Sequence, residues 1–478
     1  MDKQARKEAQ ELLRRERQSA QPKGRGYLYY LLLIISVVYI SDEIASNVGM
    51  QMQSVIAQVL FAPVFGQDMA VARMSMLTSI TMAASLFAMF YKPLADRYGR
   101  KPFLVINTLC MGLSMVVVSV ATNIPVYLLG AMIIAFFTPH DMHAVYLLEA
   151  TPPRHRAKLF SVVKAVATLG VMCIPLLRRL FMPEGVEGWR LVYLVPSAVA
   201  VIATIVALIF VRETDAFLVK RLEYLRTDPA QREATKKEKQ VEQAQGGMVS
   251  AARYCFRHRQ LRWLLIAGIF LQWGFLMPMY YEATMTQGYA APFLAQGMAL
   301  EAAKAAAMPI VTQALLLFPI GCALPQLVHG FFSDKWGRKP TVILTALCAV
   351  GGFVLFYIGA GQNWIPWLVG LLCGAAVGST WSTIDIAGAI MCSESAPTNL
   401  RSSVLSVQPL LSGIIGGVVM AAGIVLVNIF GDAYAGLISL AVAVPGMLIG
   451  VVIITLKVRE TKHVKLEEIT GREEEAPQ

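Results

Sequence analysis

Residues 96–102 read D-R-Y-G-R-K-P, and the pattern returns at residues 334–340 as D-K-W-G-R-K-P. A second pattern, E-x-x-P-x-x-x-R, also occurs twice, at residues 149–156 and 394–401. In each half of the chain the first pattern follows the second long apolar run, and the second pattern ends the fourth. Two different patterns that recur at matching places indicate an internal duplication.

The composition indicates a membrane protein. Of the 478 residues, 56% are hydrophobic and only 15% are charged, whereas about a quarter of an ordinary soluble domain is charged. Disorder, a disulfide scaffold and a soluble multidomain enzyme are excluded. Twelve apolar runs are long enough to cross a hydrocarbon core of roughly 30 Å, and such spans must be helices. They lie near residues 27–48, 73–94, 102–121, 126–148, 157–177, 190–211, 263–285, 307–329, 340–359, 365–389, 403–429 and 434–456.

The distribution of basic residues sets the orientation. With both termini in the cytoplasm, 36 of the 42 Lys and Arg lie on the inner side of the membrane. This asymmetry follows the positive-inside rule and predicts a multi-pass protein of the cytoplasmic membrane. The net charge of +11 then reflects topology and contact with anionic membrane lipid, and no nucleic-acid partner is expected.

The predicted organisation is two helical bundles joined by a charged linker. In such duplicated carriers the substrate site lies between the bundles near the middle of the membrane. The predicted segments are a cytoplasmic N-terminal tail (1–26), a six-helix bundle (27–211), a cytoplasmic linker (212–262), a second six-helix bundle (263–458) and a cytoplasmic C-terminal tail (459–478).

These motifs resemble those of the major facilitator superfamily, and most closely its sugar-porter and metabolite:proton symporter branch. Three further features share the resemblance: Gly188-Trp189-Arg190, Gln272 before Tyr280-Tyr281, and the ending V-R-E-T-K-H-V-K-L-E-E-I. The resemblance implies an all-α membrane protein of twelve transmembrane helices in two pseudo-symmetric bundles, working as a monomer by alternating access. Two departures stand out: Lys92 replaces a motif glycine, and Lys164 stands where sugar porters carry a sugar-binding glutamine.

The repeated motifs predict a cytoplasmic gate of ion-pair networks, which would close the inner side when the cavity faces outward. Asp96 and Asp334 are expected to face the neighbouring arginines and the positive N-terminus of a helix. The alternative is that these residues only cap helices. The predicted gate residues are Asp96, Gly99, Arg100, Lys101, Glu149, Arg156, Gly330, Asp334, Gly337, Arg338, Lys339, Glu394 and Arg401.

Ionisable residues inside the spans mark the candidate substrate and coupling site, because such groups are costly in hydrocarbon. Asp141 and Lys164 lie at equal depth on consecutive spans, and the resemblance favours Asp42 for proton coupling. For each residue alone, an interhelical hydrogen bond is the alternative. Glu282, near the outer end of its span, is expected to contact extracellular water. The predicted binding and coupling residues are Asp42, Glu43, His140, Asp141, Lys164, Gln272, Tyr280, Tyr281, Asp385 and Gln408.

No catalytic or nucleotide-binding pattern occurs in the sequence, and its seven cysteines lack metal-ligand spacing. We therefore expect no enzyme activity, cofactor or metal. The predicted function is secondary transport of a small polar or carboxylate-bearing metabolite, in symport with protons. Efflux of amphipathic organic cations by proton antiport and sugar uptake are alternatives within transport. A membrane sensor and a membrane-embedded enzyme are the alternatives outside it.

The predicted Asp141–Lys164 pair is testable by a double-mutant cycle. Lys164→Ala should lower the free energy of unfolding by about 3–5 kcal/mol, because it strands a buried carboxylate. Adding Asp141→Asn should restore part of that loss in thermal unfolding of the purified protein. Losses that simply add would show that the two residues are not partners.

Overall fold

The computed structural model describes residues 3–20, 26–87, 91, 94–138, 142–150, 156–183, 185–227, 231, 248–396 and 401–462. These residues form helices and turns, with no strand among them. The predicted all-α fold class is confirmed.

The helices of the first half follow the predicted spans, with short segments between them. In chain order they are α1 (Lys3–Ala20), α2 (Tyr27–Gln51), α3 (Gln53–Ile56), the π-helix η1 (Ala57–Phe61), α4 (Ala62–Phe65), α5 (Ala70–Thr81), the 3₁₀-helix η2 (Met82–Phe87), α7 (Leu94–Tyr98), α8 (Arg100–Ser119), α9 (Ile124–Phe137), α10 (Met142–Ala150), α11 (Arg156–Gly170), α12 (Cys173–Phe181), α13 (Trp189–Phe210) and α14 (Asp215–Arg226).

The second half has longer helices, several interrupted by 3₁₀ or π segments. They are α16 (Met248–Arg257), α17 (Arg259–Leu271), the 3₁₀-helix η4 (Gln272–Phe275), α18 (Leu276–Ala295), α19 (Leu300–Trp336), α20 (Arg338–Gly361), α21 (Pro366–Ile384), the π-helix η5 (Asp385–Ile390), α22 (Met391–Ser395), α23 (Arg401–Phe430), the 3₁₀-helix η6 (Asp432–Tyr434) and α24 (Ala435–Lys457).

Nine helices of the described part are long and apolar enough to cross a membrane. The number is ten if the pair Gln53–Phe65 and Ala70–Ser85, bent by 101°, counts as one span. The predicted spans at 73–94 and 126–148 include residues 88–90, 92–93 and 139–141, which are outside the described residues.

The chain forms two compact units. The first comprises Met1–Gly49, Leu77–Ile174 and Gly188–Val241; the second comprises Met50–Met76, Pro175–Glu187 and Glu242–Gln478. Two short segments of the first half of the sequence, residues 50–76 and 175–187, thus pack within the second unit. The predicted bundle boundaries stay a prediction.

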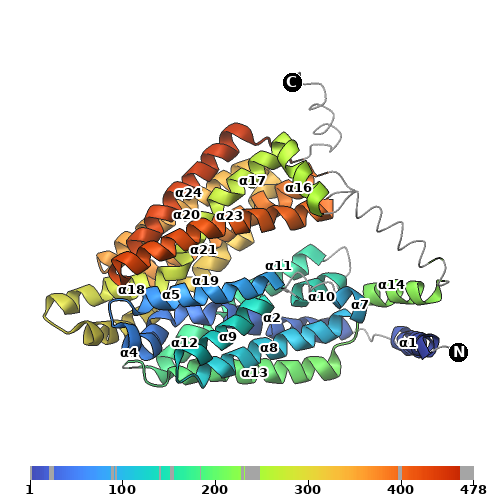
Figure 1. The fold of residues 1–478 in the computed structure, drawn as a ribbon, viewed down its shortest axis with the longest axis horizontal. Helices are drawn as coiled ribbons and strands as arrows, with labels where there is room; N and C mark the ends of the chain where they lie inside the picture. Colours follow the sequence, from blue (N-terminus) through green and yellow to red (C-terminus); the bar gives the residue numbers. More distant parts are fainter. Residues whose placement is uncertain are drawn as a thin grey trace. The chain divides into compact units, whose positions relative to one another are not determined.

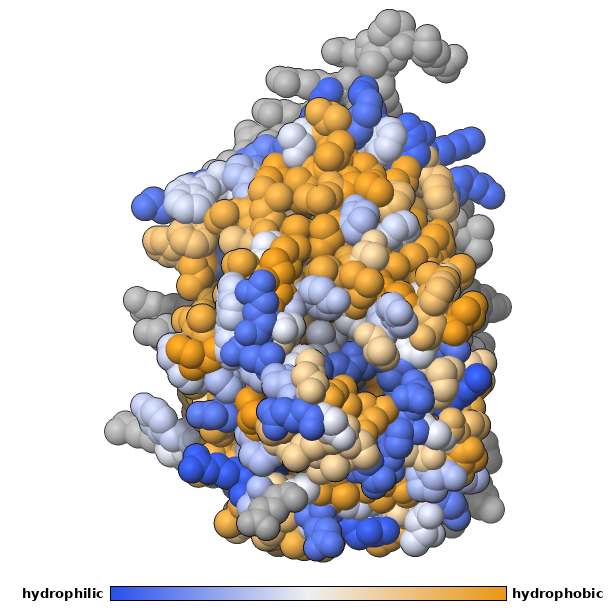
Figure 2. Space-filling view, turned by 90° about the vertical axis from the view of Figure 1, so that its left-hand side faces the viewer, coloured by the Kyte–Doolittle hydropathy of each residue, from blue (hydrophilic) through white to orange (hydrophobic). Residues whose placement is uncertain are grey.

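In the first unit, α8 and α13 lie side by side (Figure 1). Ala200, Ala203 and Ala207 on α13 are buried, whereas Ile202 and Ile209 on the same helix are 60% and 66% exposed. Small residues inside and large apolar residues outside are typical of a helix that faces lipid. On the face drawn in Figure 2, hydrophobic side chains likewise cover broad areas of the surface.

Helix α1 packs against α14 at the end of the first unit that carries residues 96–102 (Figure 1). Glu11 on α1 accepts hydrogen bonds from the Arg221 guanidinium on α14 at 2.9 and 3.0 Å. These hydrogen bonds lower the pKa of the Glu11 carboxyl below its usual value. The carboxylate therefore stabilises this contact at neutral pH, and the contribution is lost as the pH falls through its lowered pKa.

In the second unit, α19 and α21 approach closely through glycines spaced four residues apart on α21. A Cβ on Gly370, Gly374 or Gly378 would lie 1.7, 2.0 or 2.2 Å from a backbone carbonyl oxygen of α19. Small residues at this spacing let helix backbones meet in a membrane, where dispersion contacts drive helix association. These glycines set the distance between the two helices.

Gly374→Ala should therefore lower the free energy of unfolding by about 1–3 kcal/mol, because the new methyl group forces α19 and α21 apart. Gly351→Ala is the matched control: a Cβ there has no neighbour within 4 Å among the described residues. The control should be neutral or slightly stabilising. Equal apparent melting temperatures for the two variants would contradict the packing argument.

Candidate functional site

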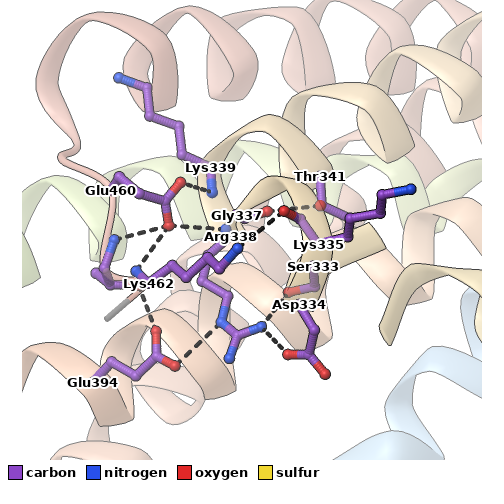
Figure 3. Close-up of polar contacts among 11 residues, drawn as sticks. Ser333, Asp334, Lys335, Gly337, Arg338, Lys339, Thr341, Glu394, Glu460 and Lys462 are labelled. Atoms are coloured by element: carbon purple, nitrogen blue, oxygen red, sulfur yellow. Dashed lines mark hydrogen bonds and ion pairs between the residues drawn. The ribbon is translucent and has the colours of Figure 1, made fainter. Parts of the chain in front are cut away.

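Arg338, the first residue of α20, joins two carboxylates of the second unit (Figure 3). Its Nη1 donates to Asp334 Oδ1 at 2.6 Å, and its Nε donates to Glu394 Oε1 at 3.2 Å. Glu394 also accepts a hydrogen bond from the Thr461 hydroxyl at 2.6 Å. Residues from α19, α20, α22 and the segment after α24 thus meet at one end of the unit, which we call the motif end.

Glu460 caps the start of α20 (Figure 3). Its Oε1 accepts from the N–H of Arg338 at 2.8 Å, and its Oε2 accepts from the N–H of Lys339 at 3.0 Å. It also accepts from the N–H groups of Thr461 and Lys462. A carboxylate is stabilised at a helix N-terminus because the free N–H groups and the helix dipole favour negative charge.

The first unit repeats the arginine–glutamate, threonine–glutamate and capping contacts of this arrangement. Arg100, the first residue of α8, binds Glu149 at 3.0 Å, and Glu149 accepts from the Thr214 hydroxyl at 2.7 Å. Glu213 accepts from the N–H groups of Arg100 and Lys101 at 2.9 and 3.2 Å. The two halves therefore have the same arginine–glutamate pair and the same glutamate cap at their motif ends.

The motif glycines Gly99 and Gly337 leave room for these capping carboxylates. Both have positive φ, 119° and 110°, a conformation that favours glycine. A Cβ on Gly99 would lie 2.2 Å from Glu213 Oε2, and one on Gly337 would lie 2.6 Å from Glu460 Oε2. Any larger residue would displace the cap.

Asp334 faces the adjacent arginine, as expected: it is 78% exposed, and its Oδ1 accepts from Arg338 at 2.6 Å. The N–H groups of Arg338 and Lys339 at the start of α20 bind Glu460. The side chains of Asp96, Arg156 and Arg401 are outside the description. The roles of these residues in a gate stay a prediction.

Glu213 and Glu460 are functional candidates that the sequence analysis did not identify. Their signal is a third repeat, V-R-E-T, at residues 211–214 and 458–461. It follows the sixth and the twelfth predicted span, so both copies reach the motif end.

A second group of candidates lies midway along the helices of the second unit. Gln272 opens the 3₁₀-helix η4, which interrupts the α17–α18 span, and its amide donates to the Ser412 hydroxyl on α23 at 3.0 Å. Phe275 of η4 meets Trp381 of α21 edge to face, with ring centroids 4.7 Å apart. Trp381 is 47% exposed. Interrupted helices with polar and aromatic side chains are typical of transporter binding sites.

Asp385 and His329 lie on the neighbouring helices α21–η5 and α19. Asp385 is half-buried and begins the π-helix η5, a kind of interruption frequent at functional sites. His329 Nδ1 lies 3.2 Å from the Ser382 hydroxyl. The side chain of Gln408 is outside the description.

Tyr280 and Tyr281 are fully buried in α18. The Tyr281 ring stacks on Phe318 of α19 with centroids 4.8 Å apart. The next residue, Glu282, was expected to contact extracellular water, and this expectation is wrong. Glu282 is 0% exposed and forms an ion pair with Arg178 at 3.1 Å. Arg178 lies on α12, 104 positions before Glu282 in the sequence. No local sequence pattern indicates a contact between residues so far apart.

The predicted residues of the first unit are only partly described. Asp42 and Glu43 are half-buried on α2, and Lys164 is half-buried on α11. His140 and Asp141 lie outside the described residues, so the Asp141–Lys164 pair stays a prediction. Within the described ranges, no three His, Cys, Asp or Glu side chains are grouped so that they could hold a metal ion.

Apolar spans, interrupted helices and duplicated clusters at the motif end define a multi-pass membrane carrier. A model of the Major Facilitator Superfamily matches residues 37–384, and the chain belongs to this superfamily. Members of this superfamily are membrane transporters and not enzymes.

Three proteins illustrate the similarity. The chain is 26% identical to the glucose transporter GlcP of Staphylococcus epidermidis over 133 residues, which cover 27% of this chain and 28% of that protein. It is 23% identical to the uncharacterized MFS-type transporter YfiU of Bacillus subtilis, with 68% and 66% covered. The inward open structure of the xylose transporter XylE from E. coli is 15% identical, with 93% and 99% covered and a TM-score of 0.61. The last likeness supports the fold.

The capping role of Glu460 predicts a stability difference at the motif end. Glu460→Ala removes the acceptor of four backbone N–H groups and should lower the free energy of unfolding by about 1–3 kcal/mol. The matched control Asp334→Ala removes one exposed ion pair and should cost less than about 1 kcal/mol. Thermal unfolding in detergent compares them, and a larger loss for Asp334→Ala would overturn the assignment of the cap.

Proposed function

We propose that this transporter carries a small polar or carboxylate-bearing metabolite across the cytoplasmic membrane in symport with protons. The observation that carries the proposal is the pair of matched clusters at the two motif ends. Arg100 with Glu149 and Glu213, and Arg338 with Glu394 and Glu460, tie several helix ends of each unit together. Each bundle is then stiff at this end, which suits alternating access by rigid-body rocking.

The motif end is the cytoplasmic end in this proposal. The support is the inner-side excess of Lys and Arg under the positive-inside rule. Both termini then lie in the cytoplasm, and the opposite end of the second unit faces the outside.

The substrate class follows from the residues midway along the helices. Gln272, which donates to Ser412, offers an amide group, and Trp381 offers an exposed ring. Lys164 adds a positive charge in the first unit, which favours a carboxylate on the substrate. Sugar uptake is the second candidate, because the similar proteins named above are a glucose and a xylose transporter, and aromatic and amide groups also suit a sugar.

Proton coupling is assigned to Asp42. A carboxylate in a poorly solvated cavity favours its neutral form, which brings its proton affinity towards the working pH. Asp42 is half-buried on α2, in the half of the helix remote from Tyr27, where external protons would arrive. A related fold, that of XylE, is described as a proton:xylose symporter.

Asp42→Asn should abolish proton-driven accumulation but keep counterflow exchange, because exchange needs no net proton release. The measurement is uptake of carboxylates and sugars into proteoliposomes with an imposed pH gradient, with and without a protonophore. Glu43→Gln is the comparison, since Glu43 is the alternative coupling residue and adjacent helix positions point about 100° apart. Loss of accumulation in Glu43→Gln but not in Asp42→Asn would transfer the role to Glu43.

Accumulation that resists the protonophore would exclude proton symport. Accumulation that Asp42→Asn leaves unchanged would exclude Asp42 as the coupling residue. Lys164→Gln separates the substrate classes: it should reduce uptake of carboxylates by at least about tenfold and leave sugar uptake unaffected.

A further inference from the structure

A cavity of about 300 Å³ lies at the motif end of the second unit. It opens between the start of α17, the start of α20 and the end of α24. Its lining includes four basic residues, Arg259, Lys339, Lys457 and Arg459. The acidic residue of the lining, Glu460, already accepts from four backbone N–H groups. A cavity with this charge is suited to an anion.

Hydrogen bonds hold the walls of the cavity in place before any ligand binds. The Gln260 side chain of α17 donates to the Arg459 carbonyl at 2.9 Å and accepts from the Arg459 N–H at 3.0 Å. The Lys339 ammonium of α20 donates to the carbonyls of Thr455 and Val458 at 2.8 and 2.9 Å. Lys339 thereby satisfies carbonyls at the end of α24, whose partial negative charge would otherwise oppose an anion.

Two guanidinium groups of the cavity are available to a ligand. Arg259 and Arg459 are exposed, and neither forms an ion pair with a carboxylate of the described ranges. Positive charges that share a cavity repel one another, and an anion between them relieves this repulsion. A guanidinium binds phosphate oxygens through two parallel N–H groups, so a phosphate matches the chemistry of the cavity.

The cavity also borders apolar surface. Leu456, which belongs to its lining, is 71% exposed, and Lys457 Nζ lies 5.6 Å from the ring centroid of Trp263. Two candidate membrane spans, Arg259–Ala295 and Asp432–Lys457, begin and end here. Basic groups beside a tryptophan at the end of a span are typical of the lipid headgroup level, and basic pockets between spanning helices bind headgroups of acidic lipids. These neighbours favour a phospholipid over a free anion.

We propose that this cavity binds the phosphate group of an anionic phospholipid, with Arg259 and Arg459 on its oxygens and an acyl chain along Leu456. The lipid joins the start of α17 to the end of α24, the first and the last span of the second half of the chain. It therefore stabilises that half in the membrane. Placement of the lipid in the inner leaflet rests on the proposed function, whereas the site itself rests on the cavity.

The test is binding of phosphatidylglycerol to the purified protein in a nonionic detergent. Because the lipid binds the folded state, it should raise the apparent melting temperature in a saturable way. The double variant Arg259→Gln with Arg459→Gln removes two positive charges and should weaken this binding at least about tenfold. Arg459→Gln alone keeps the backbone contacts with Gln260. It should weaken binding about fivefold and decides the question if the double variant fails to fold.

The matched control is Arg253→Gln with Arg257→Gln. It removes the same number of charges from α16, where both residues are exposed and neither lines the cavity. The control should bind phosphatidylglycerol as the parent does. Equal weakening in the two double variants would show a general attraction of the basic surface to acidic lipid and would overturn the site.

Two other ligands separate the sources of the phosphate. Phosphatidylcholine and inorganic phosphate should raise the apparent melting temperature less than phosphatidylglycerol does at equal concentration. A rise with inorganic phosphate that matches the lipid would assign the cavity to a soluble phosphate and overturn the lipid. Equal binding of phosphatidylcholine would overturn the selectivity for an anionic lipid. These readouts need no transport, so failure of proton symport leaves them intact, and absence of lipid binding leaves proton-driven uptake intact.

Discussion

Inside a membrane every buried backbone amide and every buried charge must find its partner within the protein, since no water is available to replace it. The free N–H groups at buried helix starts need partners in the same way, and together these needs explain the placement of the acidic residues. Glu213, Glu460 and Asp432 each accept hydrogen bonds from the free N–H groups at the start of a helix, α8, α20 and α5 respectively. Glu282 meets a guanidinium and a backbone N–H. In each case the carboxylate satisfies groups that the fold itself leaves open.

The internal duplication repeats the capping of a helix start by a glutamate in both halves of the chain. The V-R-E-T segments place a glutamate on the N–H groups of α8 and α20 and a threonine on the carboxylates of Glu149 and Glu394. The glycine of each D-x-x-G-R-K loop keeps the space free, because a Cβ there would meet the glutamate. Three sequence patterns that lie far apart in the chain thus form one cluster of contacts, and this cluster occurs once in each half.

Hydropathy and repeats were sufficient to predict the helical class and the superfamily, because apolar length and loop motifs are local properties. Contacts that join distant segments were beyond local reasoning. The expectation that Glu282 contacts water is wrong because no nearby feature of the sequence indicates its partners, Arg178 and the backbone N–H of Ser54. The contact of Asp334 with Arg338 was predictable because both belong to one motif, whereas the cap of α20 comes from Glu460, 122 positions away in the sequence.

The two ends of the second unit hold their charges in different ways. At the motif end, Asp334 is 78% and Glu394 29% exposed, so water already screens these pairs and each is worth little on its own. There the geometry depends on capped helix ends. At the opposite end, Arg178 and Glu282 are fully buried, and the strength of their pair depends on whether water is present. A pair of this kind is strong because protein groups surround both charges and exclude the solvent that would screen them. The second unit therefore stabilises one end through a single buried pair and the other through capped helix starts.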